Sequence, residues 1–196
     1  IAVIFDGEGP IAMRTPARPD EVDHAEVALN GVSGTAEILA RATLEPFYGI
    51  RATGYAPQSA DATVSLLEGI ETLLPVEGGF QESLVRAWFI MTGQPVVSHL
   101  LVAPKSWAPE QVNQLAATMT ALRSAGHARR SELRAAVASE AGIEREQMVS
   151  LFAKVRYALD ETDRRALLML LQRGNKGSAY PYPWSVDYFA VEPASE

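Results

Sequence analysis

The stretch Leu84–Lys105, LVRAWFIMTGQPVVSHLLVAPK, decides the predicted fold because it joins a helix to a buried strand. Apolar side chains recur at the helical spacing of three and four residues in its first part: Leu84, Ala87, Trp88 and Met91. The sequence Thr92-Gly-Gln-Pro95 then ends the helix, since glycine adopts the left-handed cap and proline cannot continue a helix. The apolar run that follows, Val96–Val102, predicts a strand covered on both faces.

Upstream of this stretch the sequence predicts several strands with one helix among them. Ile1–Phe5 reads as a buried strand, and the residues that follow predict either a hairpin or a bent strand. His24–Leu29 predicts another strand, which leads through a tight turn into a helix from Thr35 to about Tyr48. Two short strands are predicted after this helix, at Ile50–Tyr55 and Ala62–Leu67. Connections this short favour a right-handed parallel strand–helix–strand unit.

Downstream of Val102 the sequence predicts four helices and a tail. The predicted helices span Pro109–Ala125, Ser131–Glu140, Glu144–Leu159 and Glu161–Arg173. The tail is rich in glycine, proline and aromatic residues, and Tyr180–Trp184 predicts a polyproline-like segment laid over the body. The whole pattern indicates an α/β protein whose C-terminal half is helical.

Composition limits the classes of function. The chain has 196 residues, 47% hydrophobic and 21% charged, which is typical of a soluble globular protein with one domain or two small lobes. A net charge of −7 argues against a nucleic-acid or anionic-membrane partner. The absence of cysteine excludes disulfides, a thiolate nucleophile and a zinc–thiolate site. No apolar run is long enough for a membrane span, and no signal peptide precedes Ile1, so either processing or a missing upstream segment explains that first residue.

The turn Asn30–Thr35, NGVSGT, is the best candidate for a binding site. A strand that ends in such a turn and opens a helix directs several backbone amides and the hydroxyls of Ser33 and Thr35 toward one spot, which suits a carboxylate or phosphate oxygen. The alternative is that Ser33 only caps the helix. The sequence is neither a nucleophile elbow nor a phosphate-binding P-loop, since it lacks the spacing of both motifs.

The remaining polar candidates are dispersed. The three histidines, His24, His99 and His127, have no metal-ligand spacing, so no metal site is predicted. His99 lies inside the apolar strand, where it is either a hydrogen-bonded interior histidine or a ligand contact at the edge of a pocket. Asp6 and Glu8 are either an acid/base pair or ordinary turn residues.

Several ordered motifs carry a family resemblance. They are Trp88-x-x-x-Thr92-Gly93-x-Pro95, then Ala103-x-Lys105, then Val155-Arg156-Tyr157-x-Leu159, preceded by Val27–Leu29 with Ser33-x-Thr35. The segment Leu84–Gly177 thereby resembles the C-terminal part of the chorismate dehydratase family of the futalosine menaquinone pathway, and the Ser33-x-Thr35 helix start is similar to the one that contacts the substrate in that family.

The resemblance implies a two-lobe, periplasmic-binding-protein-like fold with an incomplete first lobe. The implied parts are a crossover strand and connector at residues 1–22, a small α/β lobe with the ligand-facing helix start at 23–95, a hinge strand and four helices of the other lobe at 96–177, and an aromatic, proline-rich tail at 178–196. No part of this chain corresponds to the segment that carries the catalytic base in the family, so the catalytic residues stay unassigned. The family's Gly-Asp pair falls at Leu67-Glu68.

The implied function is dehydration of chorismate to an enolpyruvyl benzoate in the cytoplasm, without a metal or organic cofactor. The predicted ligand contacts are Asn30, Ser33, Gly34, Thr35 and His99. The alternative is a non-catalytic, solute-binding-like protein or a structural subunit. In that case a second copy or a partner chain would cover the incomplete lobe, because large apolar patches are rarely left in water.

Overall fold

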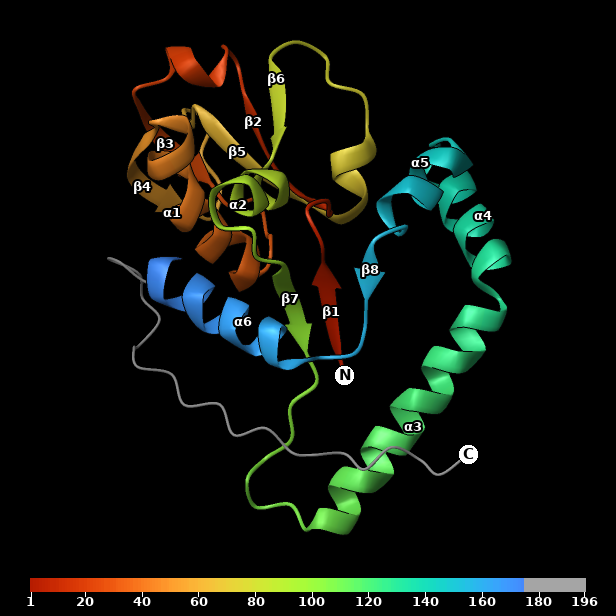
Figure 1. The fold of residues 1–196 in the computed structure, drawn as a ribbon. Coiled ribbons are helices and arrows are strands. Elements are labelled where there is room, and N and C mark those ends of the chain that lie inside the picture. The colour runs from red at the N-terminus through yellow and green to blue at the C-terminus, as the bar shows by residue number, and fades with distance from the viewer. Residues whose placement is uncertain (175–196) are drawn as a thin grey trace.

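Two β-sheets contain the strands of the computed structural model, which describes residues 1–174 (Figure 1). The larger sheet has the order β4-β3-β5-β2-β6, formed by Arg51–Ala56, His24–Ala28, Val64–Glu68, Ile11–Thr15 and Phe80–Ser83. The smaller sheet has the order β7-β1-β8, formed by Val96–Leu100, Ala2–Phe5 and Val155–Arg156. Together with the helices, these sheets confirm the α/β class. The predicted tail segment Tyr180–Trp184 lies outside the described residues.

The helices are α1 to α6, and two short 3₁₀ turns accompany them. Their bounds are Gly34–Tyr48, Leu84–Thr92, Pro109–Ala128, Arg130–Ala141, Arg145–Leu151 and Glu161–Gly174, with the turns η1 at Pro19–Glu21 and η2 at Gly69–Leu73. The predicted caps are present: the Ser33 hydroxyl accepts a hydrogen bond from the Ala36 amide, and Gly49 and Gly93 adopt the left-handed conformation.

The chain crosses between the two sheets twice. The first crossing runs from β1 to β2, and the second runs from α2 to β7 through Pro95. Because β1 and β2 belong to different sheets, the hairpin alternative for the first residues is wrong. Within the larger sheet β3 pairs in parallel with β4 and with β5, which confirms the predicted parallel unit.

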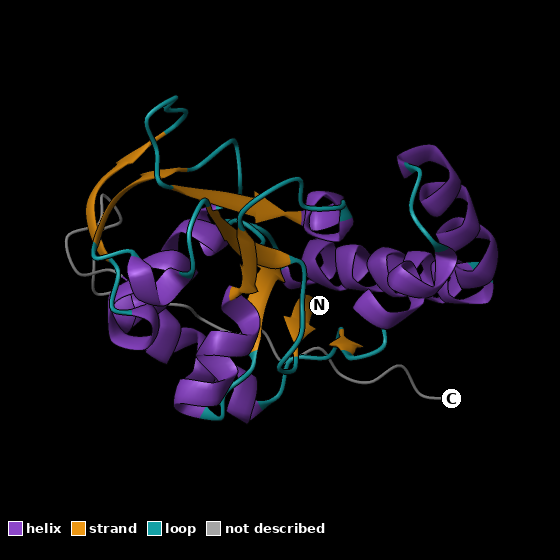
Figure 2. Ribbon diagram, turned by 90° about the horizontal axis from the view of Figure 1, so that it is seen from above, coloured by secondary structure: helices purple, strands orange, loops and turns teal. Residues whose placement is uncertain are grey.

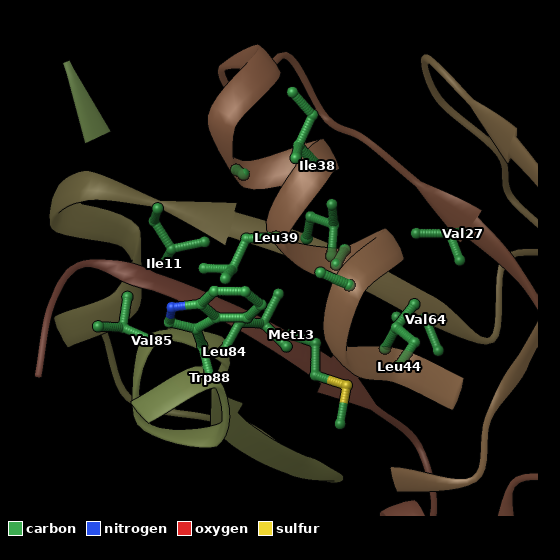
Figure 3. Packing of buried hydrophobic residues seen from close by; sticks show 14 of the residues in the cluster. Ile11, Met13, Val27, Ile38, Leu39, Leu44, Val64, Leu84, Val85 and Trp88 are labelled. Carbon is green, nitrogen blue, oxygen red and sulfur yellow. The ribbon is translucent and has the colours of Figure 1, made fainter. Parts of the chain in front are cut away.

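The main core lies where α1 and α2 pack on the larger sheet (Figure 3). Leu84, Ala87 and Trp88 of α2 are at most 1% exposed, as their helical spacing predicts. They meet Ile11 and Met13 of β2, and a row of α1 side chains that includes Leu39. A smaller cluster forms where α6 packs on the smaller sheet; its buried members are Ala2, Ile4, Val97 and Leu167.

The strand prediction at Val96–Val102 is wrong at its end. β7 stops at Leu100, Leu101 is 38% exposed, and Val102 is 73% exposed. The last backbone hydrogen bond of this ladder joins the Leu101 amide to the carbonyl of Ile1. In the register of this ladder Leu100 pairs with Ala2, and the exposed Leu101 and Val102 lie beyond the paired residues, so the hydrophobic run is longer than the strand.

The predicted helix Glu144–Leu159 is also wrong in its second half. α5 ends at Leu151, and Val155–Arg156 instead forms β8 against β1. The apolar spacing through Val155 is helical, but pairing with β1 overrides that local pattern. Two further differences are smaller: β6 was not predicted, and α3 continues through Gly126 to Ala128.

The helices α3 and α4 project beside the sheets as an arm (Figures 1 and 2). In α3 only Val112 and Ala116 are buried, and in α4 only Ala138. Leu122 of α3 is therefore open to solvent, with 59% of its surface exposed. No helix among residues 1–174, α3 included, is both long and apolar enough to cross a bilayer.

Candidate functional site

The candidate site lies at the carboxyl ends of β3 and β5. From β3 the chain passes through α1 to β4 on one side, and then returns to β5 on the other side of β3. In open parallel sheets, ligands bind outside the carboxyl ends of the strands where the connections diverge in this way. The predicted turn Asn30–Thr35 follows β3, and Glu68 is the last residue of β5. The fold thus brings the predicted turn to the position where α/β sheets most often form a crevice.

The turn itself is built by Asn30 and Gly31. Both have positive φ, 52° and 75°, and the Val32 amide donates to the Leu29 carbonyl at 3.1 Å. Positive φ at both central positions defines a type I′ turn, for which Asn-Gly is the preferred pair. The Asn30 side-chain amide lies 3.5 Å from the Leu66 carbonyl. Asn30 therefore has a conformational role in shaping the turn, beside its predicted role as a ligand contact.

Ser33 holds the carboxylate of Glu68. The Ser33 backbone amide donates to Glu68 Oε2 at 2.6 Å, and the Ser33 hydroxyl donates to Oε1 at 2.8 Å. The same hydroxyl oxygen accepts from the Ala36 amide, so Ser33 caps α1 and binds a carboxylate at once. An anion is favoured here because the helix N-terminus carries a partial positive charge. The turn thus binds the carboxylate of Glu68, a residue of the protein itself, and a ligand contact by Ser33 stays a prediction.

Thr35 and His99 are arranged differently from Ser33. The Thr35 hydroxyl donates to the Ser98 carbonyl at 2.8 Å, which fixes the first turn of α1 to β7. His99 is exposed, and its Nδ1 lies 2.8 Å from the Ser98 hydroxyl. The interior alternative for His99 is wrong: Val96, Val97 and Ser98 are buried, but the side chain of His99, after the register shift at Ser98, is exposed. His99 and Thr35 are brought near each other through Ser98, and a ligand contact by either residue stays a prediction.

Glu68 is the functional candidate that sequence reasoning missed. The sequence gives one indication of its role: Glu68 directly follows a predicted strand and corresponds to the acidic residue of the family's Gly-Asp pair. Ser33 and Glu68 are 35 residues apart, so no local pattern links them. Gly34, the first residue of α1, is exposed beside them.

The other sequence candidates have structural partners. Asp6 is bound by Arg156, with 2.6 Å between Oδ2 and Nε, and Glu8 lies 3.5 Å from Lys154. These contacts favour the structural alternative over an acid/base pair. Among residues 1–174 no group of three or more histidine, aspartate or glutamate side chains is placed to hold a metal ion.

Comparison with known proteins agrees with the motifs. A search of curated proteins finds no match to the chain. A family model described as menaquinone biosynthesis matches residues 6–176, which include all six helices and every strand except β1. The match confirms the resemblance to the chorismate dehydratase family that the ordered motifs indicate. The chain belongs to the menaquinone biosynthesis family.

Proposed function

We propose that this protein binds chorismate at the Ser33–Glu68 site and dehydrates it to an enolpyruvyl benzoate. The observation that carries the proposal is the pair of short hydrogen bonds from Ser33 to a carboxylate at the end of β5. Chorismate offers carboxylates of the same chemistry. Family membership supports a role in this pathway, and the Ser33 geometry supports a carboxylate as the ligand.

The first step in this proposal is an exchange of carboxylates. A carboxylate of chorismate takes the Ser33 amide and hydroxyl donors, and the Glu68 side chain moves aside. Both carboxylates cannot share these donors, because two like charges at contact distance repel strongly. The N-terminus of α1 and the backbone of the Asn30–Gly31 turn then favour the ligand's charge.

The second step is elimination of water from the ring. A ring carbon loses a proton, the neighbouring hydroxyl leaves and becomes water, and the ring becomes aromatic. We assign the displaced Glu68 carboxylate the role of proton carrier: it accepts the ring proton and passes it to the leaving hydroxyl, which departs as water. We infer that residues 23–95 and 96–177 form the two lobes of a periplasmic-binding-protein-like fold. If the lobes close on the ligand by bending at the two sheet crossings, bulk water is excluded from the site.

The alanine substitution Ser33→Ala tests the carboxylate-binding role. We expect it to weaken chorismate binding about 10- to 100-fold, since a hydrogen bond to a charged group contributes about 1.5–3 kcal/mol. Calorimetric titration measures the affinity, and chromatography of chorismate incubations measures the enolpyruvyl benzoate formed.

Ser83→Ala is the matched control for this test. Ser83 caps α2 by accepting from the Arg86 amide, so its loss removes a helix cap of the same kind from a different helix. Equal loss of chorismate affinity in both variants would show that Ser33 acts only through helix stability. Product formation that is unchanged in Ser33→Ala would contradict the proposal.

A second candidate function is a structural subunit of an assembly. The exposed arm favours it, because Leu122, Leu133 and Val137 of α3 and α4 are each more than 40% exposed. Size-exclusion chromatography with light scattering separates the two functions. A monomer that gains thermal stability with chorismate supports the enzyme, and a chain found only in assemblies that chorismate does not stabilise supports the subunit.

A further inference from the structure

A pocket lies between α1, the edge strand β4 and the last turn of α6, away from the Ser33–Glu68 site. Its volume is about 710 Å³, within the range of small-molecule sites. Neither Ser33 nor Glu68 lines it. Its polar lining includes Arg41, Tyr55 and Arg173, and apolar side chains of α1 and Ile50 line it as well. We call it the Arg41–Arg173 pocket.

Arg41 is fixed in place before any ligand arrives. Its Nε and Nη2 both donate to Glu37 Oε1, at 2.9 and 2.7 Å, and its guanidinium carbon lies 3.8 Å from the centre of the Tyr55 ring. The Arg41 side chain is only 16% exposed. These contacts leave some of its five N–H groups for an oxygen ligand, and an oriented guanidinium loses little entropy on binding a carboxylate or phosphate.

Two further polar groups of the pocket, on Arg173 and Tyr55, are also donors. The guanidinium carbon of Arg173 lies 5.7 Å from the centre of the Trp88 ring. Burial raises the pKa of Tyr55 to about 12, and the smaller opposing effect of Arg41 does not cancel it, so the phenol stays a hydrogen-bond donor at neutral pH. Glu45, an acidic residue of the wall, is 71% exposed and lies 3.8 Å from Arg51.

The β4 wall has the features of a built site. β4 pairs only with β3, so its outer backbone edge is unpaired within the sheet. Its register shifts between Ala52 and Gly54, which makes Thr53 the extra residue of a β-bulge. Bulges are concentrated at sheet edges and beside functional sites, where they redirect a side chain. Thr53 lines the pocket.

We propose that the Arg41–Arg173 pocket binds the oxyanion of a small metabolite, either a carboxylate or a phosphate monoester. The two guanidinium groups and the Tyr55 hydroxyl bind the oxyanion, and Pro46 and Ala52, the exposed apolar residues of the lining, contact the apolar part of the ligand. This site is independent of the proposed dehydration, because it shares no residue with the Ser33–Glu68 site.

Titration of the full chain with benzoate and with phenyl phosphate, at constant ionic strength, tests this site. These probes share an aromatic ring and differ in the oxyanion. In ¹H–¹⁵N spectra we expect the amides of Thr53 and Tyr55 to shift with a dissociation constant of about 1 mM or lower for at least one probe. Arg173→Gln should weaken that binding at least about tenfold. Arg41→Lys keeps the charge but removes the planar fork, and it should weaken binding as well.

The controls separate this site from general charge and from the proposed function. Arg129→Gln removes the same charge from the arm and should leave the dissociation constant unchanged, as should Ser33→Ala. A response to only one probe supports the site and identifies the oxyanion class. No shift at Thr53 and Tyr55 with either probe, or an equal weakening by Arg129→Gln, would overturn the proposal.

Discussion

Replacing Arg156 with methionine is expected to lower the free energy of unfolding by about 3 kcal/mol, because it leaves the Asp163 carboxylate buried without its counter-charge. Asp163 is 0% exposed, and Arg156 binds it at 2.7 and 3.0 Å. Arg156 also binds Asp6, so one side chain connects β8, α6 and the turn after β1. The loss of unfolding free energy should lie near the low end of the range measured when a buried ion pair is broken, since Arg156 is itself 38% exposed. Urea unfolding measures the change.

Two comparison variants make this prediction specific. Arg129→Met breaks a fully exposed pair with Glu132 and should lower the free energy of unfolding far less than Arg156→Met does. Adding Asp163→Asn to Arg156→Met removes the unpaired charge and should restore part of the lost stability. A loss below about 1 kcal/mol in Arg156→Met would contradict the assigned role.

The pH dependence of stability is a second readout of the same pair. Burial alone would raise the pKa of the Asp163 carboxyl, but hydrogen bonds from Arg156 and Asp160 outweigh burial and hold the pKa below its ordinary value. A depressed folded pKa means that the stabilisation is complete above the unfolded pKa of about 4 and is lost as the pH falls through the folded value. Arg156→Met should therefore lose less stability than the wild type between about pH 5 and pH 2.

The second large effect is expected for Trp88→Ala, which should cost about 3–5 kcal/mol. Trp88 is fully buried where α2 meets β2 and α1, so alanine leaves a cavity that a packed core fills only in part (Figure 3). Thermal or urea unfolding checks the value.

Trp88→Phe and Trp107→Ala are the controls for this prediction. The indole Nε1 of Trp88 has no hydrogen-bond partner among the described residues, so phenylalanine loses ring volume but no hydrogen bond. Trp88→Phe should therefore lower the free energy of unfolding much less than Trp88→Ala does. Trp107 is 37% exposed, and its alanine variant should change stability by about 1 kcal/mol or less. Equal losses in Trp88→Ala and Trp107→Ala would contradict the central position of Trp88.

The parts of the fold that sequence predicted correctly are those that local patterns determine. The apolar face of α2, the Ser33 cap and the left-handed glycines at residues 49 and 93 all follow from spacing over a few residues. The errors occur where distant segments decide the outcome. Val155–Arg156 became a strand because β1 pairs with it, and the strand after Pro95 ends at Leu100, which pairs with Ala2 of β1.

The candidate site shows the same division. The turn and the helix start could be predicted from Asn30–Thr35, since their residue types fix the local backbone. The Glu68 partner of Ser33 and the exposure of His99 could not, because both depend on how β5 and β7 meet α1. A local motif therefore predicted a carboxylate-binding helix start, but not that Glu68 would occupy it.

Titration of chorismate into the wild type and Glu68→Gln tests the central claim most directly. Chorismate competes with the Glu68 carboxylate for the Ser33 donors, so removing that charge should tighten binding about tenfold or more. Product formation should fall in the same variant, since the assigned proton acceptor is lost. Tighter binding without turnover is the result the account predicts. Weaker binding in Glu68→Gln, or no chorismate binding by either protein, would contradict it.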